Sequence, residues 1–204
     1  MSTNENKPNK PRDFSMKIRS TTETAFQRAI WGSKTSKVGR TTVTWIDIEL
    51  PVNQSGNPRG RCIDLIGIDD QKEYVICELK FGKNTKDAPA KAAKQVNEYL
   101  KFIQDNRNSL QPPHKKARLP IDWRKVAAKS TRKIVAANKD YWNHWSDPKR
   151  NKDKKSTTSI PDGIECYTLD ISTKLFAEQK KKSKEATYTP EITEERNIWT
   201  PVDL

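Results

Sequence analysis

The sequence predicts an α/β domain of the mixed α+β type, in which helices flank a central mixed β-sheet of about five strands. Three observations lead to this fold class. Five short stretches have the apolar alternation or apolar runs that are typical of strands. A long amphipathic helical pattern separates the third stretch from the fourth, which favours a parallel crossover there. The chain has 204 residues, which is long enough for one sizeable core.

The composition predicts how this domain is bounded. Only 33% of the residues are hydrophobic and 32% are charged, so we expect polar extensions on a compact body. Residues 1–13, rich in Asn, Lys and Pro, are predicted to be a disordered lead. Residues 14–176 are predicted to form the single domain. Residues 177–204 contain a lysine run without a clear period and are predicted to be a charged C-terminal extension.

The first predicted elements are a short helix and a strand. Ser20 lies three residues before Glu23, the spacing of a capping box, and an apolar face follows until Gly32. These signals predict a helix of about three turns. Thr42 to Leu50 then alternates well enough for a strand. Its predicted faces are Thr44, Ile46, Ile48 and Leu50 on one side, and Trp45, Asp47 and Glu49 on the other.

A hairpin is predicted from Arg61 to Phe81, and the functional interpretation depends on its register. Side chains alternate along a strand, so Glu78 and Lys80 point the same way. Asp64 lies in the partner strand and shares their face only if it pairs with Glu78, because a one-residue slip exchanges the faces. That pairing requires a turn centred on Gln71, with a loop of three or five residues.

The second half of the chain is predicted to supply the longest helix and two more strands. The helix runs from Ala88 to about Arg107, and Gln95 and Tyr99 lie four residues apart on one of its faces. An aromatic run from Tyr141 to Trp145 is interpreted as core rather than as a base-stacking surface. The remaining predicted elements are a short helix at Ile121 to Lys129 and strands at Lys133 to Ala137 and Ile164 to Ile171.

The charge balance and the cysteines indicate a partner class and a compartment. Lys and Arg outnumber Asp and Glu by 39 to 26, a net charge of +13, which favours a polyanionic partner such as nucleic acid. Three widely spaced cysteines without a CxxC pair indicate buried thiols in a reducing compartment. No signal-peptide core and no apolar run of about 18 residues is present. We therefore expect a cytoplasmic protein without a membrane partner.

The hairpin residues suggest metal-dependent hydrolysis. Mg²⁺ prefers oxygen ligands and commonly takes one or two carboxylates, which Asp64 and Glu78 would supply. Mn²⁺ is expected to substitute for it. Lys80 would orient or deprotonate a water molecule, or offset charge that builds on phosphorus. Such a set suits hydrolysis of a phosphodiester.

The same residues carry a family resemblance. Asp64 followed, after thirteen intervening residues, by Glu78-Leu79-Lys80 resembles the PD-(D/E)xK nuclease superfamily, and Gln95 to Tyr99 is similar to the QxxxY motif of its RecB-like branch. The resemblance implies a restriction-endonuclease-like core, metal binding by the aspartate and the glutamate, and a catalytic role for the lysine. It also implies an acid on the first helix, which by position is Glu23. Ile63 departs from the motif, which has Pro there.

Three assignments have alternatives. Glu23 is either the third metal ligand or the closing residue of a capping box with Ser20. Glu49, on the preceding strand, is a second candidate for the extra acid. Gln95 and Tyr99 either hold the lysine, a water molecule or a phosphate by hydrogen bonds, or form the polar edge of a core helix.

These residues lead to one expected function and two alternatives. We expect a Mg²⁺-dependent nuclease that hydrolyses phosphodiester bonds in DNA, acting as a homodimer or as a subunit of a larger DNA-processing complex. A single site cuts one strand, so cleavage of both strands would require two sites or two sequential cuts. The alternatives are a catalytically silent nucleic-acid-binding subunit and an RNA nuclease, because no sequence-reading element separates DNA from RNA.

Overall fold

The computed structural model describes residues 16–17, 23–52, 62–83, 86–110, 119–147, 159–183, 187–188 and 190–203. The predicted lead at 1–13 and Ser20 of the predicted capping box lie outside these residues. The helical elements are α1 (Glu23–Ser33), α2 (Pro89–Asn106), α3 (Trp123–Val126), α4 (Lys139–Ser146), α6 (Thr173–Lys182) and the 3₁₀ turn η1 (Glu194–Arg196). The strands are β1 (Met16–Lys17), β2 (Thr35–Val38), β3 (Thr41–Pro51), β4 (Cys62–Asp69), β5 (Tyr74–Lys80), β6 (Arg132–Asn138), β7 (Ile164–Leu169), β8 (Thr187–Tyr188) and β9 (Ile198–Pro201).

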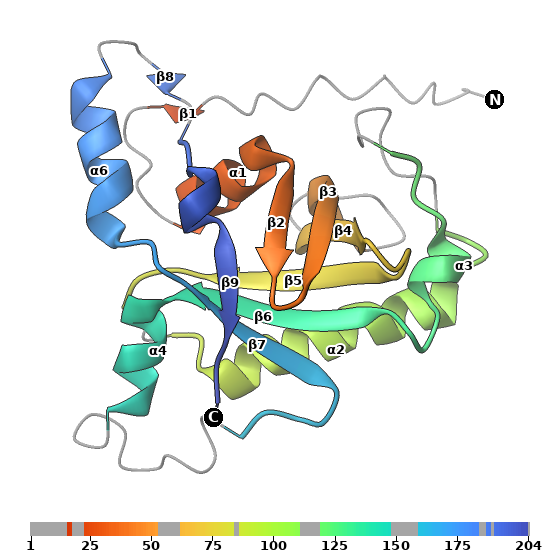
Figure 1. The fold of residues 1–204 in the computed structure, drawn as a ribbon. Coiled ribbons are helices and arrows are strands. Elements are labelled where there is room, and N and C mark those ends of the chain that lie inside the picture. Colours follow the sequence, from red (N-terminus) through yellow and green to blue (C-terminus); the bar gives the residue numbers. More distant parts are fainter. Residues whose placement is uncertain are drawn as a thin grey trace, which may run out of the picture.

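Seven of the strands form a closed mixed barrel in the order β2-β3-β4-β5-β6-β7-β9 (Figure 1). The predicted fold, an open sheet of about five strands flanked by helices on a restriction-endonuclease-like core, is therefore wrong. The five expected strands are present as β3 to β7, and the pairs β5–β6 and β6–β7 are parallel, as the helical crossover requires. Closure comes from β2 and β9, two short strands that the sequence pattern did not predict.

Strand β9 closes the barrel because it pairs with both open edges. It runs parallel to β2 and antiparallel to β7. It belongs to the segment 177–204, so part of the predicted extension lies inside the sheet. Trp199, which is 1% exposed, stacks on Trp45 of β3 with ring centroids 5.3 Å apart. Burying two large aromatic rings against each other stabilises this seam by several kcal/mol, at about 25 cal/mol for each Å² of apolar area.

Asn197 fixes the position of this last strand. Its Nδ2 donates to Ser33 Oγ and to the Thr35 carbonyl, both at 2.7 Å. Its Oδ1 accepts from Ser36 Oγ at 2.9 Å and from Trp199 Nε1 at 3.0 Å. Because Asn197 is 3% exposed, these four bonds satisfy a buried amide completely and define one register for β9.

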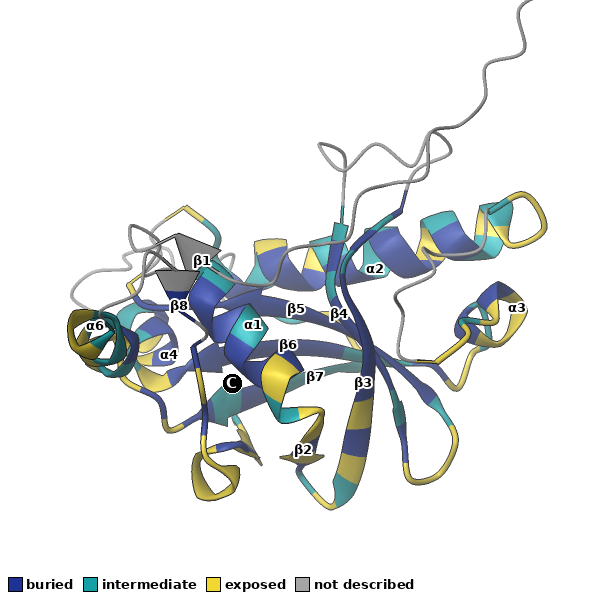
Figure 2. Cartoon of the chain, turned by 90° about the horizontal axis from the view of Figure 1, so that it is seen from above, coloured by how far each residue is buried: buried dark blue, intermediate teal, exposed yellow. Residues whose placement is uncertain are grey.

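The strands separate two apolar clusters. One contains residues of α1, α6 and β9, and the other contains residues of α2, α3 and α4. In Figure 2 the strands are largely buried, whereas α2 and α3 alternate between buried and exposed residues. Along β5, Val75, Cys77 and Leu79 belong to the first cluster and Ile76 to the second. The alternation therefore places Glu78 and Lys80 on the side of α2.

Several smaller predictions have clear outcomes. The core interpretation of the aromatic run is confirmed, since Tyr141, Trp142 and Trp145 are buried on α4. The predicted faces of the strand at Thr42 to Leu50 are partly wrong, because a bulge between Trp45 and Asp47 shifts Ile48 to the face of Trp45. All three cysteines are free, although only Cys77 is fully buried. Within the described residues, no helix combines the length and apolarity needed to cross a membrane.

Candidate functional site

The β4–β5 hairpin has the predicted register, with a turn centred on Gln71. Leu65 pairs with Cys77 and Ile68 pairs with Tyr74, so the pairing is centred on Gln71. The Asp69 N–H donates to the Glu73 carbonyl at 3.0 Å, which leaves a three-residue loop. Continued by one step, the same register places Asp64 opposite Glu78. The two carboxylates therefore share one face of the hairpin, as predicted.

Lys80 is the centre of the site. Its ammonium lies 2.7 Å from Glu78 Oε1, 3.8 Å from Glu23 Oε1 and 4.0 Å from Asp87 Oδ2. The Lys80 and Glu78 side chains are 3% and 5% exposed, whereas that of Glu23 is 36% exposed. The structure thus brings Glu23 of α1 to the hairpin, as the resemblance implied. It also adds Asp87, which precedes α2 and which sequence reasoning missed.

Asp64 is held from two directions. Its Oδ2 accepts a hydrogen bond of 2.7 Å from the Leu79 N–H of the partner strand. From α1, Gln27 Nε2 donates to the Asp64 carbonyl at 2.7 Å and lies 3.4 Å from its Oδ1. Gln27 is only 5% exposed. The sequence did not predict it as a site residue. Its position one helical turn after Glu23 is the signal that would have identified it, since residues four apart share a helix face.

The two α2 candidates differ. Tyr99 is buried beside Glu78, and burial together with the Glu78 carboxylate raises the pKa of its hydroxyl. Gln95 has a buried Oε1 that accepts no hydrogen bond within the described part of the chain. The structure therefore places Tyr99 beside Glu78, and Gln95 lies one helical turn before Tyr99 on α2.

The choice between the two extra acids also has a structural basis. Glu49 lies opposite Asp64 in the β3–β4 register, between the pairs Ile48–Leu65 and Leu50–Ile63. Its backbone is left-handed, with φ of 50°, so the strand is irregular at this point. Glu23 contacts Lys80 directly. Glu23 is therefore the better supported fourth member of the site.

The carboxyl groups of the site carry more negative charge than the one lysine offsets. Burial is the main cause that raises the pKa of Glu23, Asp64 and Glu78, and mutual repulsion adds to it for Asp64 and Glu23. Burial alone would lower the pKa of Lys80, but the surrounding carboxylates outweigh it and the net shift is upward. Lys80 is therefore a fixed cation in this arrangement, which favours charge compensation over proton abstraction.

The donor atoms suit a hard divalent cation. Glu78 Oε2 is buried and has no hydrogen-bond partner among the described residues. Buried carboxylates whose pKa values are raised by burial gain by binding a metal, which favours their ionised form. No group of three or more His, Cys, Asp or Glu in the described ranges forms a ready-made cage. Mg²⁺ does not need one, because it commonly takes one or two carboxylates and keeps several waters.

Comparison with known proteins adds no relative. No family model matches the chain, and neither a curated protein nor a solved structure matches it. The function is therefore inferred from the geometry of these side chains.

Proposed function

We propose that the protein is a Mg²⁺-dependent nuclease that hydrolyses phosphodiester bonds in DNA. The observation that supports this most directly is the grouping of Glu23, Asp64 and Glu78 around the buried ammonium of Lys80. The resemblance to the PD-(D/E)xK superfamily is part of the proposal, as a likeness of motif only, since the barrel differs from the fold that the motif implied.

The proposed roles follow from the contacts. One or two of the carboxylates of Asp64, Glu78 and Glu23 would hold the cation, which when bound supplies an activated water and stabilises the departing oxygen. Gln27 and the Leu79 N–H hold Asp64 in place. Lys80 stays protonated and offsets the negative charge that develops on the phosphoryl oxygens. Tyr99 lies beside Glu78 and limits its movement.

The choice of substrate and compartment belongs to the same proposal. The net charge of +13 favours a polyanion. A cation held by the carboxylates would also have to bind the substrate, and the phosphate oxygens of a phosphodiester can bind such a cation. Three free cysteines agree with a reducing cytoplasm. Cutting both strands would require a homodimer or two sequential cuts.

The test compares Lys80→Met with wild type on plasmid, single-stranded DNA and RNA, with Mg²⁺, with Mn²⁺ and with EDTA. Methionine keeps most of the buried volume and removes the charge together with the hydrogen bond to Glu78. We expect metal-dependent cutting of DNA by wild type and a loss of about a hundredfold or more in the variant. Lys181→Ala, which removes an exposed lysine on α6, is the control and should cut normally.

The outcomes separate the proposal from its alternatives. Equal cutting by Lys80→Met and wild type would remove the catalytic assignment. Binding of nucleic acid without cutting under either metal would identify a silent binding subunit. Preferential cutting of RNA would replace DNA as the substrate.

A further inference from the structure

A second feature lies at the other end of α2. Helix α2 starts beside the site, where Asp87 reaches Lys80, and ends against α3 (Figure 1). An open pocket of about 630 Å³ lies between the C-terminal end of α2 and α3. Its lining residues are Gln104, Asp105, Arg107, Arg124, Ala127, Ala128 and Lys129. We call this the α2–α3 pocket.

The α2–α3 pocket is basic and its cations are not neutralised. Arg107, Arg124 and Lys129 are all exposed, and none of them forms an ion pair within the described residues. The one acid in the lining, Asp105, lies 3.7 Å from Lys101, so its charge is already offset. The negative end of the α2 dipole favours a cation at Arg107, but it does not explain three cations around one concavity. Their mutual repulsion would be relieved by a bound anion.

We propose that the α2–α3 pocket binds the backbone phosphates of duplex DNA. Its lining contains no aromatic side chain, whereas proteins that bind single strands usually stack bases on aromatic rings. Its open shape and its long, exposed cations suit phosphate contacts, which position a duplex without reading its sequence.

The spacing agrees with a duplex that also reaches the candidate site, and in this respect the inference rests on the proposed function. Arg107 follows Tyr99 by about two helical turns, roughly 12 Å along the axis of α2. A DNA strand carries one phosphate for about every 3.4 Å of helix axis, so the pocket would hold phosphates roughly three to four nucleotides from the reacting bond.

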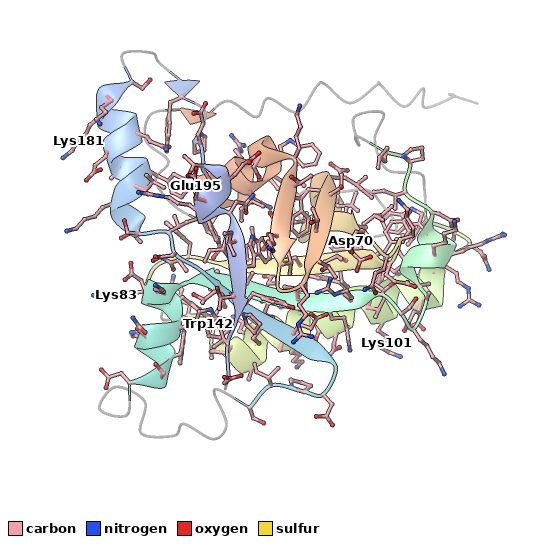
Figure 3. All side chains as sticks on the ribbon, in the orientation of Figure 1. Asp70, Lys83, Lys101, Trp142, Lys181 and Glu195 are labelled. Atoms are coloured by element: carbon pink, nitrogen blue, oxygen red, sulfur yellow. The ribbon has the colours of Figure 1, made fainter. Side chains whose placement is uncertain are left out.

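The test measures duplex binding without cleavage. Wild type and the triple variant Arg107→Ala, Arg124→Ala, Lys129→Ala are titrated in EDTA against a fluorescent DNA duplex from 50 to 300 mM salt. The control is Lys174→Ala, Lys181→Ala, Lys182→Ala on α6, which removes the same charge from exposed positions at the opposite end of the molecule (Figure 3). We expect the pocket variant to bind about tenfold more weakly or worse at 0.1 M salt, with a salt slope smaller by about two to three.

Every outcome decides the proposal. A larger loss in the pocket variant than in the α6 control, together with the reduced slope, supports it. Equal losses in the two variants, no loss in the pocket variant, or wild-type binding to duplex RNA but not to duplex DNA would overturn it. Because the assay contains no divalent metal, a pocket that binds DNA would still be detected if the protein proved unable to cut.

Discussion

The β4–β5 hairpin carries two charged clusters, one at each end, and their electrostatics are opposite. At the turn end, Asp69 Oδ1 accepts from the Gln71 and Glu73 N–H groups at 3.0 and 2.9 Å. Arg132 Nη1 lies 3.2 Å from Asp69 Oδ2, and Arg132 makes a bidentate contact with Glu165 at 2.8 and 2.7 Å. Asp69, Arg132 and Glu165 each contact an opposite charge.

At the other end, the charges are not matched. Glu23, Asp64 and Glu78 share one lysine, and Glu78 Oε2 has no partner among the described residues. The pKa values show the contrast: burial raises that of Glu78, whereas hydrogen bonds from Arg132 and Tyr167 outweigh burial and lower that of Glu165. A buried cluster that lacks charge compensation reduces stability, so its presence favours a functional role. The turn cluster fixes the register that aligns this site.

The largest difference should appear when the two aspartates of β4 are compared. Asp64→Asn removes the charge but keeps an oxygen that can accept from the Leu79 N–H, so we expect a folded protein whose DNA cleavage falls by at least about a hundredfold. Asp69→Asn should retain cleavage wherever it is folded but lose about 2 kcal/mol of stability, because Arg132 and two backbone N–H groups lose a charged acceptor. Plasmid cleavage and urea denaturation measure the two effects.

Two results would contradict the expected difference between Asp64→Asn and Asp69→Asn. If Asp69→Asn lost cleavage while keeping its stability, the turn cluster would have a chemical role. If Asp64→Asn lost stability in proportion to its activity, the loss would reflect unfolding.

A smaller effect is expected from the same substitution at two glutamates. Glu165→Gln loses charge-assisted hydrogen bonds from Arg132 and Tyr167, which should cost about 1 to 2 kcal/mol at neutral pH. Glu78→Gln should change stability by less than about 1 kcal/mol or increase it, because its environment already disfavours the charge. Denaturant titration of both variants under one buffer condition checks this. Equal destabilisation by the two substitutions would contradict the proposed contrast.

The local parts of the fold could be predicted from the sequence. The long helix was expected from Ala88 to about Arg107 and lies at Pro89–Asn106, because its apolar stripe is strongly periodic. The hairpin register could be predicted only conditionally. If Asp64 and Glu78 act together, the turn must be centred on Gln71. Barrel closure could not be predicted. It depends on pairing β9, a four-residue strand, with a strand about 160 positions earlier in the chain, and on the Asn197 hydrogen bonds that fix it.

The candidate site shows the same division. Asp64, Glu78 and Lys80 follow from strand alternation, and Glu23 came from the resemblance. Asp87 depends on how the segment before α2 packs against the hairpin, which no local pattern contains, whereas Gln27 shares a helix face with Glu23 and only its contact with Asp64 depends on packing. Their contacts with Asp64 and Lys80 span regions that are far apart in the sequence.

The smallest expected effect is a difference in pH dependence, measured in EDTA. The raised pKa values of Glu23, Asp64 and Glu78 mean that the folded state binds more protons than the unfolded state at pH values above the ordinary carboxyl range. Their contribution to stability is therefore full at acidic pH and is lost as the pH rises through the raised values. The lowered pKa of Glu165 has the opposite sign, and its contribution is lost only as the pH falls below the ordinary range.

The free energy of unfolding from urea titrations between pH 5 and 8 separates these signs. Wild-type stability should fall more steeply with pH than that of Asp64→Asn combined with Glu78→Gln, whereas Glu165→Gln should keep the wild-type slope. Mg²⁺ should flatten the wild-type slope, because a cation that binds the ionised carboxylates stabilises the folded state most where those groups have lost their protons. Parallel curves for wild type and the double variant would show that the carboxylates at the end of β5 are as well compensated as those around Arg132, and the electrostatic contrast between the two ends of the hairpin would not hold.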